Sequence, residues 1–408
     1  MQVKESVVVG VLGCMAERVK AGLLGEGLAS VVAGPDSYRD LPRLLATQRL
    51  TGQAAINVLL SLQETYSGVT PVRLNNSVSA FVSIQRGCDN MCSYCIVPFT
   101  RGRERSRPVA SILEEVALLR EAGVREVTLL GQNVNSYRDT SRQTEQLFPA
   151  VSPGQGTVPG FSTVYKQKQG GFRFSHLLDQ VSAANPDMRI RFTSPHPKDF
   201  PAEVLDMIAD RPNICRVLHL PAQSGSSSVL AAMGRGYTRE AYLSLVEAAR
   251  ARLPGLAITS DFITGFCGET EEDFRQTVDL VRRVGYHKCF MFPYSMREKT
   301  GAHRRLEDSV PQEVKAERHL RLKEAFVEGV KELHSSYHSS VQAVLVTGDS
   351  RRSPDDLQGL ADCGTKVIFP KTPENCPRPG QIVSVEILAS SSEVLKGRVT
   401  GLEYHQSC

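Results

Sequence analysis

The sequence predicts an α/β protein built around a partial, TIM-like (βα)6 barrel, with a short α/β unit before it and a small all-β barrel after it. Two observations predict this order. Short apolar runs alternate with helical patterns from about residue 78 to residue 295, and short β-rich runs separated by glycine and proline fill the last stretch. Alternating strands and helices form parallel βαβ units. Six units are too few for a closed eight-fold barrel, so we expect an open one.

The composition is that of a globular chain. The sequence has 408 residues, of which 41% are hydrophobic and 23% are charged, and this predicts two or three domains. The net charge of +4 permits an anionic partner without requiring one. No run is long and apolar enough to span a membrane. The N-terminus shows neither a secretory signal nor an Arg-rich transit sequence, so we expect the cytosol or the nucleus.

The first unit is predicted to cover residues 1–75. Residues 5–13 have the β-branched, glycine-ended pattern of a buried parallel strand, and a helical pattern opens at Met15. Cys14 lies between them, where α/β folds place ligands; a buried structural thiol is the alternative. Residues 31–75 are interpreted as the end of this unit and a connector. Because the chain begins within a strand pattern, we expect this unit to be a remnant of a larger domain.

The central barrel is predicted over residues 76–310. Between its strands, apolar residues recur at helical spacing, as at Ile112, Val116 and Leu119. Residues 138–171 interrupt the alternation with Ser, Thr, Gln, Gly and Pro, and we interpret them as a long flexible insertion without catalytic residues. The expected strands are 80–85, 125–131, 188–194, 214–220, 256–263 and 287–293.

The C-terminal part is predicted to be a linker helix within residues 311–338 and a small β-barrel over residues 339–408. Residues 312–336 form one long, charged helical pattern with an apolar side. Several short strands separated by Gly- and Pro-rich turns are typical of a small barrel. The expected strands are 341–347, 366–369, 381–388 and 394–400.

A cysteine triplet directly follows the first barrel strand. Cys88, Cys92 and Cys95 have CxxxCxxC spacing, which indicates a metal or cluster site. A four-iron cluster normally takes four thiolates, so three would leave one iron open to a small molecule. A structural zinc site is the weaker alternative because zinc needs four ligands and no second CxxC pair exists. Chance clustering is weaker still. Free thiols of this kind predict a reducing compartment.

The triplet resembles that of the radical S-adenosylmethionine (radical SAM) superfamily. Longer strings resemble the MiaB-type tRNA-2-methylthio-N6-dimethylallyladenosine synthases among the radical SAM methylthiotransferases. These strings are most similar to those of the animal mitochondrial branch, whose members are also named for association with a regulatory subunit of cyclin-dependent kinase 5. The strings that carry the resemblance are GCMAE, QRGCDNMCSYCIVPFTRGRERSRP, LLGQNVNSY, RFTSPHP, HLPAQSGSSSVLAAMGRGYTREAY and SDFITGFCGETEEDF.

The resemblance implies two 4Fe-4S clusters and SAM as cofactors. Cys88, Cys92 and Cys95 match the catalytic ligands of the radical SAM cluster. The second cluster, which supplies or carries the sulfur, also uses three cysteines, and Cys14 matches the last of them. No other cysteine precedes Cys88 in the sequence. We therefore expect this form to be N-terminally truncated and impaired in methylthiolation.

The resemblance also implies contacts to SAM. Gly131 and Gln132 match the region that meets its amino group, and Tyr94 is expected near the adenine. The alternatives are that Gln132 caps a turn and that Gly225 permits a tight loop. Cys267 stands where many bacterial members have proline. The other matched contacts are Gln223, Ser224, Gly225, Ile263 and Gly265.

RNA contacts are expected at two places. The final barrel resembles the TRAM domain, an RNA-binding module, and in it we select Lys396 and Arg398. Arginines after the cluster loop can bind phosphates and stack on unpaired bases; the alternative is that they form internal salt bridges. In the basic run over residues 100–107 we select Arg101, Arg103 and Arg105.

The resemblance implies methylthiolation of N6-isopentenyladenosine in a tRNA anticodon loop. The enzyme alternatives are methylthiotransferases that act on a ribosomal protein or on threonylcarbamoyladenosine. An alternative of another class is a non-catalytic regulator that binds a kinase-activator protein. The sequence does not identify the electron donor.

Overall fold

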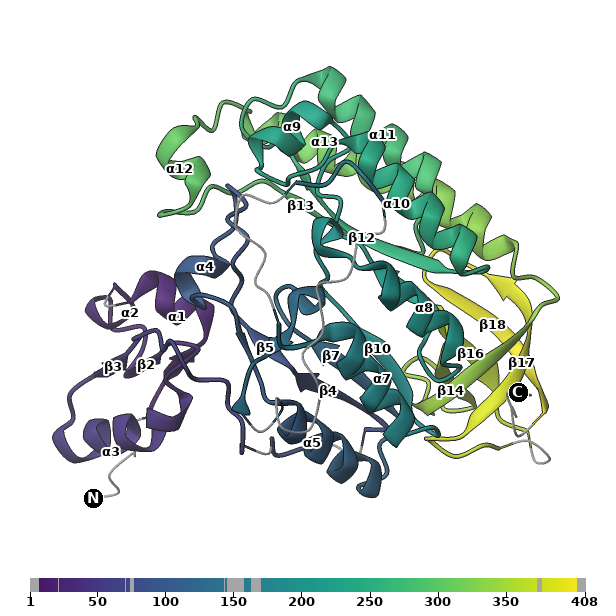
Figure 1. The fold of residues 1–408 in the computed structure, drawn as a ribbon, viewed down its shortest axis with the longest axis horizontal. Helices are drawn as coiled ribbons and strands as arrows, with labels where there is room; N and C mark the ends of the chain where they lie inside the picture. The colour runs from purple at the N-terminus through teal and green to yellow at the C-terminus, as the bar shows by residue number, and fades with distance from the viewer. Residues whose placement is uncertain are drawn as a thin grey trace.

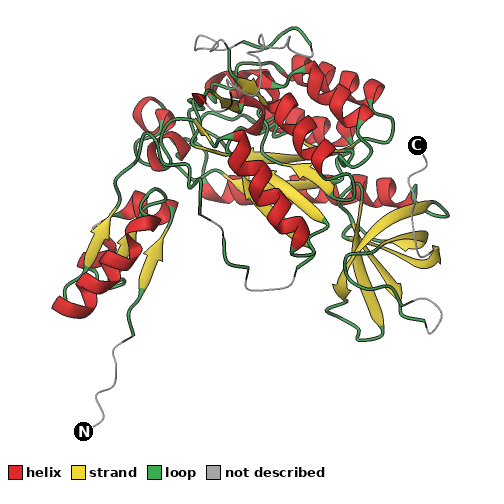
Figure 2. Cartoon of the chain, turned by 60° about the horizontal axis from the view of Figure 1, so that its bottom comes forward, coloured by secondary structure: helices red, strands yellow, loops and turns green. Residues whose placement is uncertain are grey.

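The computed structural model describes residues 7–20, 22–69, 71–73, 77–142, 144, 158–162, 170–372 and 376–401. Figure 1 shows three parts in chain order: a small N-terminal unit, a central layer of strands flanked by helices, and a C-terminal barrel. Figure 2 shows the N-terminal strands and the C-terminal barrel at opposite ends of the molecule. Among the described helices, none has both the length and the apolar character needed to cross a membrane.

The N-terminal unit is a small parallel sheet with helices. Strands β1 (Gly10–Leu12), β2 (Val31–Ala33) and β3 (Ala55–Asn57) pair in that order. The strand predicted over residues 5–13 is confirmed at its C-terminal end; residues 5 and 6 lie outside the described residues. Residues 31–75 were expected as the end of this unit and a connector, and they contain the two strands β2 and β3, which the prediction did not name. The helices are α1 (Cys14–Val19), α2 (Gly22–Gly25), the 3-10 turn η1 (Tyr38–Asp40) and α3 (Leu41–Thr51).

The central part is the expected partial barrel. Its six barrel strands pair in parallel, in the orders β4-β7-β10 and β11-β12-β13, and a parallel bridge between Ile190 and Ile214 joins the two groups. The predicted alternation of strands and helices is therefore confirmed. The strands are β4 (Ser79–Ser83), β7 (Glu126–Leu130), β10 (Arg189–Phe192), β11 (Val217–His219), β12 (Ala257–Thr264) and β13 (Lys288–Pro293).

Helices cover the outer face of these strands and bury the core against them. Ile258 and Phe262 alternate with half-buried residues along β12, so one face of the strand packs on helices. Tyr242, Phe274 and Leu322 bring three helices into the same core. The helices are α5 (Val109–Glu121), α7 (Phe174–Ala184), α8 (Ala202–Asp210), α9 (Ser227–Ala232), α10 (Arg239–Arg252), α11 (Glu271–Val284) and α13 (Gln312–Ser335).

Short elements gather at the C-terminal ends of the strands. The hairpin β5 (Gln85–Arg86) and β6 (Arg105–Ser106) encloses α4 (Val97–Thr100), and α12 (Gly301–Arg305) follows β13. Two 3-10 turns, η2 (Val134–Ser136) and η3 (Pro197–Asp199), follow β7 and β10. In barrels of this class, the residues of the functional site are expected in the loops at these strand ends.

The predicted insertion, residues 138–171, has paired ends. Strand β8 (Arg138–Asp139) pairs with β9 (Phe172–Arg173), and Phe161 forms a bridge with Tyr237. Residues 143, 145–157 and 163–169 lie outside the described residues, so the prediction of a flexible loop stays a prediction there.

The C-terminal barrel closes in the order β14-β15-β16-β18-β17. The four predicted strands are present, and β15 is an additional strand that the prediction missed. Arg189 of the central barrel donates to the carbonyl oxygens of Leu360 and Ala343, both at 2.9 Å. The strands are β14 (Val341–Asp349), β15 (Asp356–Ala361), β16 (Lys366–Pro370), β17 (Ile382–Ser390) and β18 (Val394–Gly401).

Candidate functional site

The cysteine triplet lies on a loop that the β5–β6 hairpin closes at its base. Gly87 starts this loop with φ +73°, and a Cβ there would lie 2.1 Å from the carbonyl oxygen of Arg103. Only glycine fits such a contact. The amide of Gly87 also donates to Oε1 of Gln132 at 2.7 Å. Both ends of the loop are therefore fixed relative to β4 and β7.

The three thiols of the loop have different protein surroundings. Cys88 and Cys92 are buried and Cys95 is half-buried. Asn90 donates its amide to Sγ of Cys88 at 3.4 Å. Burial raises the pKa of Cys95 to about 12 and that of Cys88 further. Iron binds thiolates, so loading this site requires the thiols to lose protons, and the energy of metal binding must drive that loss.

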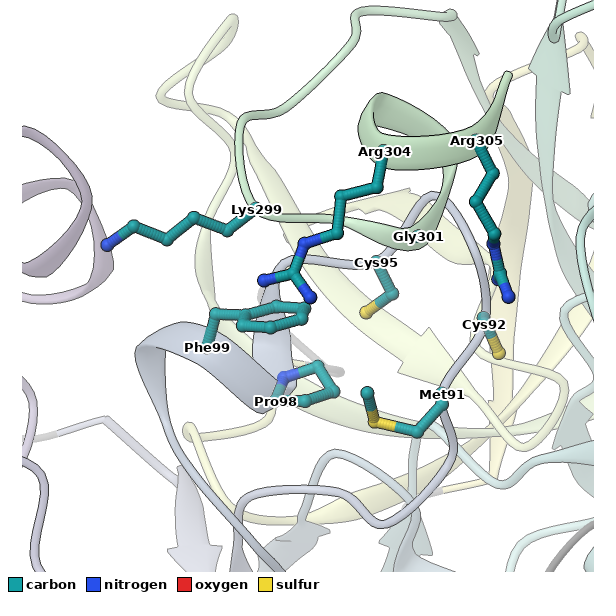
Figure 3. Close-up of a pocket in the computed structure, with 9 residues that line it drawn as sticks. All are labelled: Met91, Cys92, Cys95, Pro98, Phe99, Lys299, Gly301, Arg304 and Arg305. Carbon is teal, nitrogen blue, oxygen red and sulfur yellow. The ribbon is translucent and has the colours of Figure 1, made fainter.

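A cavity of about 340 Å³ opens beside the triplet (Figure 3). Cys92 and Cys95 contribute to its wall, together with apolar side chains of α4 and the cluster loop. In the described part of the chain no three His, Cys, Asp or Glu side chains converge on a single ion. Each thiolate of a multi-iron cluster binds its own iron, so a cluster does not need such convergence. The complete lining is Met91, Cys92, Cys95, Pro98, Phe99, Lys299, Gly301, Arg304 and Arg305.

Two buried cationic or basic side chains support Cys92. Nη1 of Arg235 lies 3.5 Å from its Sγ, and Nε2 of His196 lies 3.8 Å from it. Arg235 also donates to the hydroxyl of Tyr94 at 3.3 Å. Burial, with Arg235 and Lys198 nearby, holds the pKa of His196 far below its usual value, so this imidazole is neutral. A guanidinium and a neutral imidazole therefore both lie beside this sulfur.

The position of His196 is fixed by two asparagine side chains that follow strand β7. Asn133 and Asn135 both accept a hydrogen bond from the amide of His196, at 3.0 and 2.9 Å. Asn133 also donates to Asp199 at 2.9 Å, and Asn90 of the cluster loop reaches the same carboxylate at 3.1 Å. The loops after β4, β7 and β10 therefore form one hydrogen-bonded group around the cysteines.

Comparisons with known proteins identify the family. The Radical SAM superfamily matches residues 82–281, and the TRAM domain matches residues 335–400. The mitochondrial tRNA methylthiotransferase CDK5RAP1 of Rattus norvegicus is 57% identical, over 96% of this chain and 68% of its own length. A tRNA-2-methylthio-N(6)-dimethylallyladenosine synthase of Chloroherpeton thalassium is 45% identical, over 96% of this chain and 80% of its own length. The chain belongs to the radical SAM tRNA methylthiotransferase family.

A solved structure supports the fold of this methylthiotransferase chain. The radical S-adenosylmethionine methyltransferase TsrM from Kitasatospora setae has a TM-score of 0.50 at 17% identity, over 82% of this chain and 62% of that one. Such a likeness concerns the fold alone. Membership of the superfamily supports a 4Fe-4S cluster and SAM as cofactors, and a triplet with two buried thiols and one half-buried thiol beside an open cavity fits that pair.

The predicted SAM contacts near β7 lie close to the cluster loop of the methylthiotransferase. Gln132 holds the amide of Gly87, which is the turn-fixing role named as its alternative. Gly131 packs between Val134 and Gln85. The ring of Tyr94 meets Phe266 edge-on, with centroids 6.5 Å apart. These positions surround the triplet, and contact with SAM stays a prediction.

The other predicted SAM residues are engaged in protein packing. A Cβ on Gly225 would lie 2.4 Å from the carbonyl oxygen of Gln276, so this glycine permits the close approach of α11. Ser224 lies 3.3 Å from the hydroxyl of Thr277. A Cβ on Gly265 (φ +72°) would lie 2.3 Å from a side-chain carbon of Lys315. The two remaining residues pair through the backbone, where the amide of Ile263 donates to the carbonyl of Gln223 at 2.9 Å.

The predicted RNA-binding residues differ in how far their side chains are already bound to other parts of the protein. Arg105 is buried and forms an ion pair with Asp36 at 3.0 Å, so its guanidinium ties the N-terminal unit to the cluster loop. Arg103 accepts, through its carbonyl, a hydrogen bond from Arg105 at 3.2 Å. Arg398 pairs with Glu386 at 2.8 Å, and Lys396 is exposed. RNA contact stays a prediction for all of them, and the geometry opposes it at Arg105.

Cys14 lies where the N-terminal unit meets α4. Its Sγ accepts a hydrogen bond from Nε of Arg101 at 3.2 Å. The unit is held there by Asp36, whose fully buried carboxylate also pairs with Arg86 at 3.0 Å. Arg86 and Arg105 are the paired residues of the β5–β6 hairpin. The predicted auxiliary thiol therefore sits beside the loop of the radical SAM triplet, as α1 and α4 do in Figure 1.

Sequence reasoning missed several residues of this site. His196 and Arg235 stand 104 and 143 positions after Cys92 in the chain. Only their occurrence in the strings RFTSPHP and GRGY, quoted for the family resemblance, pointed to them. No quoted sequence string includes three further residues, which follow the last barrel strand: Lys299, Arg304 and Arg305.

Proposed function

We propose that this chain carries the radical SAM and RNA-binding parts of an enzyme that converts N6-isopentenyladenosine next to a tRNA anticodon to its 2-methylthio form. The observation that carries the proposal is the closed loop with Cys88, Cys92 and Cys95 beside a cavity. The names of the similar proteins supply the substrate. An unpaired loop base suits such a site because single-stranded bases can be splayed into a pocket.

In this proposal Cys88, Cys92 and Cys95 hold a 4Fe-4S cluster, which with bound SAM supplies radical chemistry. The chain's own residues orient and shield the site. Arg235 and His196 fix the side chain of Cys92. Tyr94 packs with buried Phe266 and Tyr294, an apolar group that keeps water away from one side of the triplet.

We also propose that Cys14 is a ligand of a second 4Fe-4S cluster. Its exposure is intermediate, and its Sγ faces Arg101 next to α4. Residues 1–87 contain one cysteine, so a polypeptide of these 408 residues alone supplies one of the three expected thiolates. Such a polypeptide should hold the second cluster weakly and be impaired in methylthiolation. Iron content after reconstitution tests this.

The substrate is tested by nucleoside mass spectrometry. Cells that lack the gene should lose 2-methylthio-N6-isopentenyladenosine and accumulate N6-isopentenyladenosine. An unchanged amount of the methylthiolated nucleoside would contradict the proposal. A loss confined to threonylcarbamoyladenosine derivatives, or to a methylthiolated ribosomal protein, would favour one of the sister activities instead.

The non-catalytic regulator is the second candidate, and the closed cysteine loop does not favour it. A kinase-activator protein that co-purifies with this chain regardless of the triplet would support it. The site of action is proposed to be the mitochondrion for the family branch, since the similar animal proteins are named mitochondrial. The expectation of cytosol or nucleus for this form stays a prediction that imaging of a tagged chain would test.

We propose four structural regions: residues 1–75, 76–310, 311–338 and 339–408. The matched ranges for the Radical SAM superfamily and the TRAM domain support the second and fourth.

A further inference from the structure

The cavity beside the triplet has a positively charged rim. Lys299, Arg304 and Arg305 line it, and none of its nine lining residues is acidic. We call these three residues the cationic rim. Within the described part of the chain, no carboxylate forms an ion pair with any of them. Lys299 also lines a smaller neighbouring cavity with Glu17 and Glu298. The two arginines have no such acidic neighbour among the lining residues.

The cationic rim is attached to the cluster loop through α12. The amide of Ala302 donates to the carbonyl of Ser93 at 2.7 Å, and Ala302 is fully buried. Thr300 caps α12 by accepting from the amide of His303. Lys299 is held at φ +70°, a conformation that non-glycine residues rarely adopt. The two arginines of α12 are therefore fixed near Cys92 and Cys95, whereas Figure 3 shows the side chain of Lys299 pointing away from both sulfurs.

Arg304 has an aromatic partner. Its guanidinium carbon lies 5.6 Å from the ring centroid of Phe99, and Figure 3 shows the guanidinium next to that ring. A cation over an aromatic face keeps its N–H groups available for acceptors at its edge. Planar arginine and aromatic groups are also surfaces on which unpaired bases stack.

We infer that the cationic rim binds phosphates of the single-stranded RNA that flanks the target nucleotide. This inference rests on the proposed function. The competing anion is the carboxylate of SAM. SAM carries one carboxylate against an ammonium and a sulfonium, so its net charge is positive and the cationic rim would oppose it. An RNA strand brings one negative charge per nucleotide, which matches the rim.

The test is RNA binding by the full chain with the rim neutralised. The variant carries Lys299→Gln, Arg304→Gln and Arg305→Gln. The probe is a labelled anticodon stem-loop that contains N6-isopentenyladenosine, followed by fluorescence anisotropy across a salt series. We expect binding at about 0.1 M salt to weaken on the order of 10- to 100-fold. The slope of log K against log salt should fall by about 2, because each phosphate contact to a single strand contributes about 0.7.

A matched control removes the same charge elsewhere. Arg275, Arg282 and Arg283 are exposed on α11, and changing all three to Gln should leave the salt slope nearly unchanged. The thermal midpoint and iron content of both variants should equal those of the parent chain. These readouts separate loss of binding from loss of folding.

Three outcomes would overturn the inference. The rim variant could bind RNA with the parent's affinity and salt slope. It could instead lose SAM affinity, measured without RNA, while it keeps RNA binding; the rim would then hold the SAM carboxylate. If the parent chain itself does not bind the stem-loop, the proposed function fails first and the inference fails with it.

Discussion

At the scale of single residues, Gly87 decides whether the cluster loop can close. We predict that Gly87→Ala loses most of its iron loading, because the added Cβ would meet the carbonyl of Arg103 at 2.1 Å. Gly123→Ala is the control. It has a similar φ of +83°, but a Cβ there meets nothing within 4 Å. Iron content after anaerobic reconstitution measures the effect. Equal loading of the two variants would show that the loop tolerates the contact.

Single residues also show what sequence can and cannot reveal about the site. The spacing of Cys88, Cys92 and Cys95 is a local signal, so it was readable directly. Arg235 reaches Cys92 from 143 positions away, and no local pattern marks it. Arg105 shows a second limit: the basic run allowed both RNA contact and an internal salt bridge, and the ion-pair partner of this side chain, Asp36, lies in another unit.

At the scale of elements, Asp273 joins α11 to the loop after β11. It forms a capping box with Thr270 and accepts hydrogen bonds from the hydroxyls of Ser226 and Ser228, both at 2.6 Å. Burial opposes its ionisation, but these hydrogen bonds outweigh burial and lower the pKa of Asp273 to about 2, from 3.8. Its contribution to stability is therefore present above pH 3.8 and is lost as the pH falls through about 2.

We predict that Asp273→Asn lowers the free energy of unfolding by about 1 kcal/mol near pH 6, the usual value of a cap. The difference from the parent chain should shrink as the pH falls from about 4 to 2, since the parent loses the same interaction. Urea denaturation at several pH values measures it. Glu272→Gln, an exposed neighbour in the same turn, should change little. A difference that does not depend on pH would contradict the assignment.

Strands also differ in how well β-strand propensity predicts them. Strand β15 was missed because its sequence, DLQGLA, contains no β-branched residue. Its inward positions are Leu357, Gly359 and Ala361, and a Cβ on Gly359 would lie 2.5 Å from the carbonyl of Leu345. Packing against the neighbouring strand therefore requires a small residue at position 359, whereas β-strand propensity favours large β-branched or aromatic residues. The strands of the central barrel were predictable because most of them contain β-branched residues and helices separate them.

At the scale of the whole molecule, the number of clusters follows from which thiols the chain supplies. We predict that the 408-residue polypeptide binds about four irons after anaerobic reconstitution and cleaves SAM to 5′-deoxyadenosine. Iron and sulfide analysis with a SAM cleavage assay on the same sample measures this. About eight irons would mean that Cys14 has found replacement ligands and that the second cluster is complete. Cys14→Ser should then return the count to about four.

The C-terminal barrel sits at the end of the strands opposite the cysteines. Arg189 at the start of β10 and Ala257 at the start of β12 contact it, whereas the cluster loop follows the end of β4. The eight residues of β12 span roughly 26 Å. One RNA that touches both ends must therefore extend along the barrel for at least that length. If the C-terminal barrel holds RNA, as its match to the TRAM domain predicts, strand length would set the number of nucleotides between the modified base and the region held there, and the enzyme would select its target by distance as well as by contact.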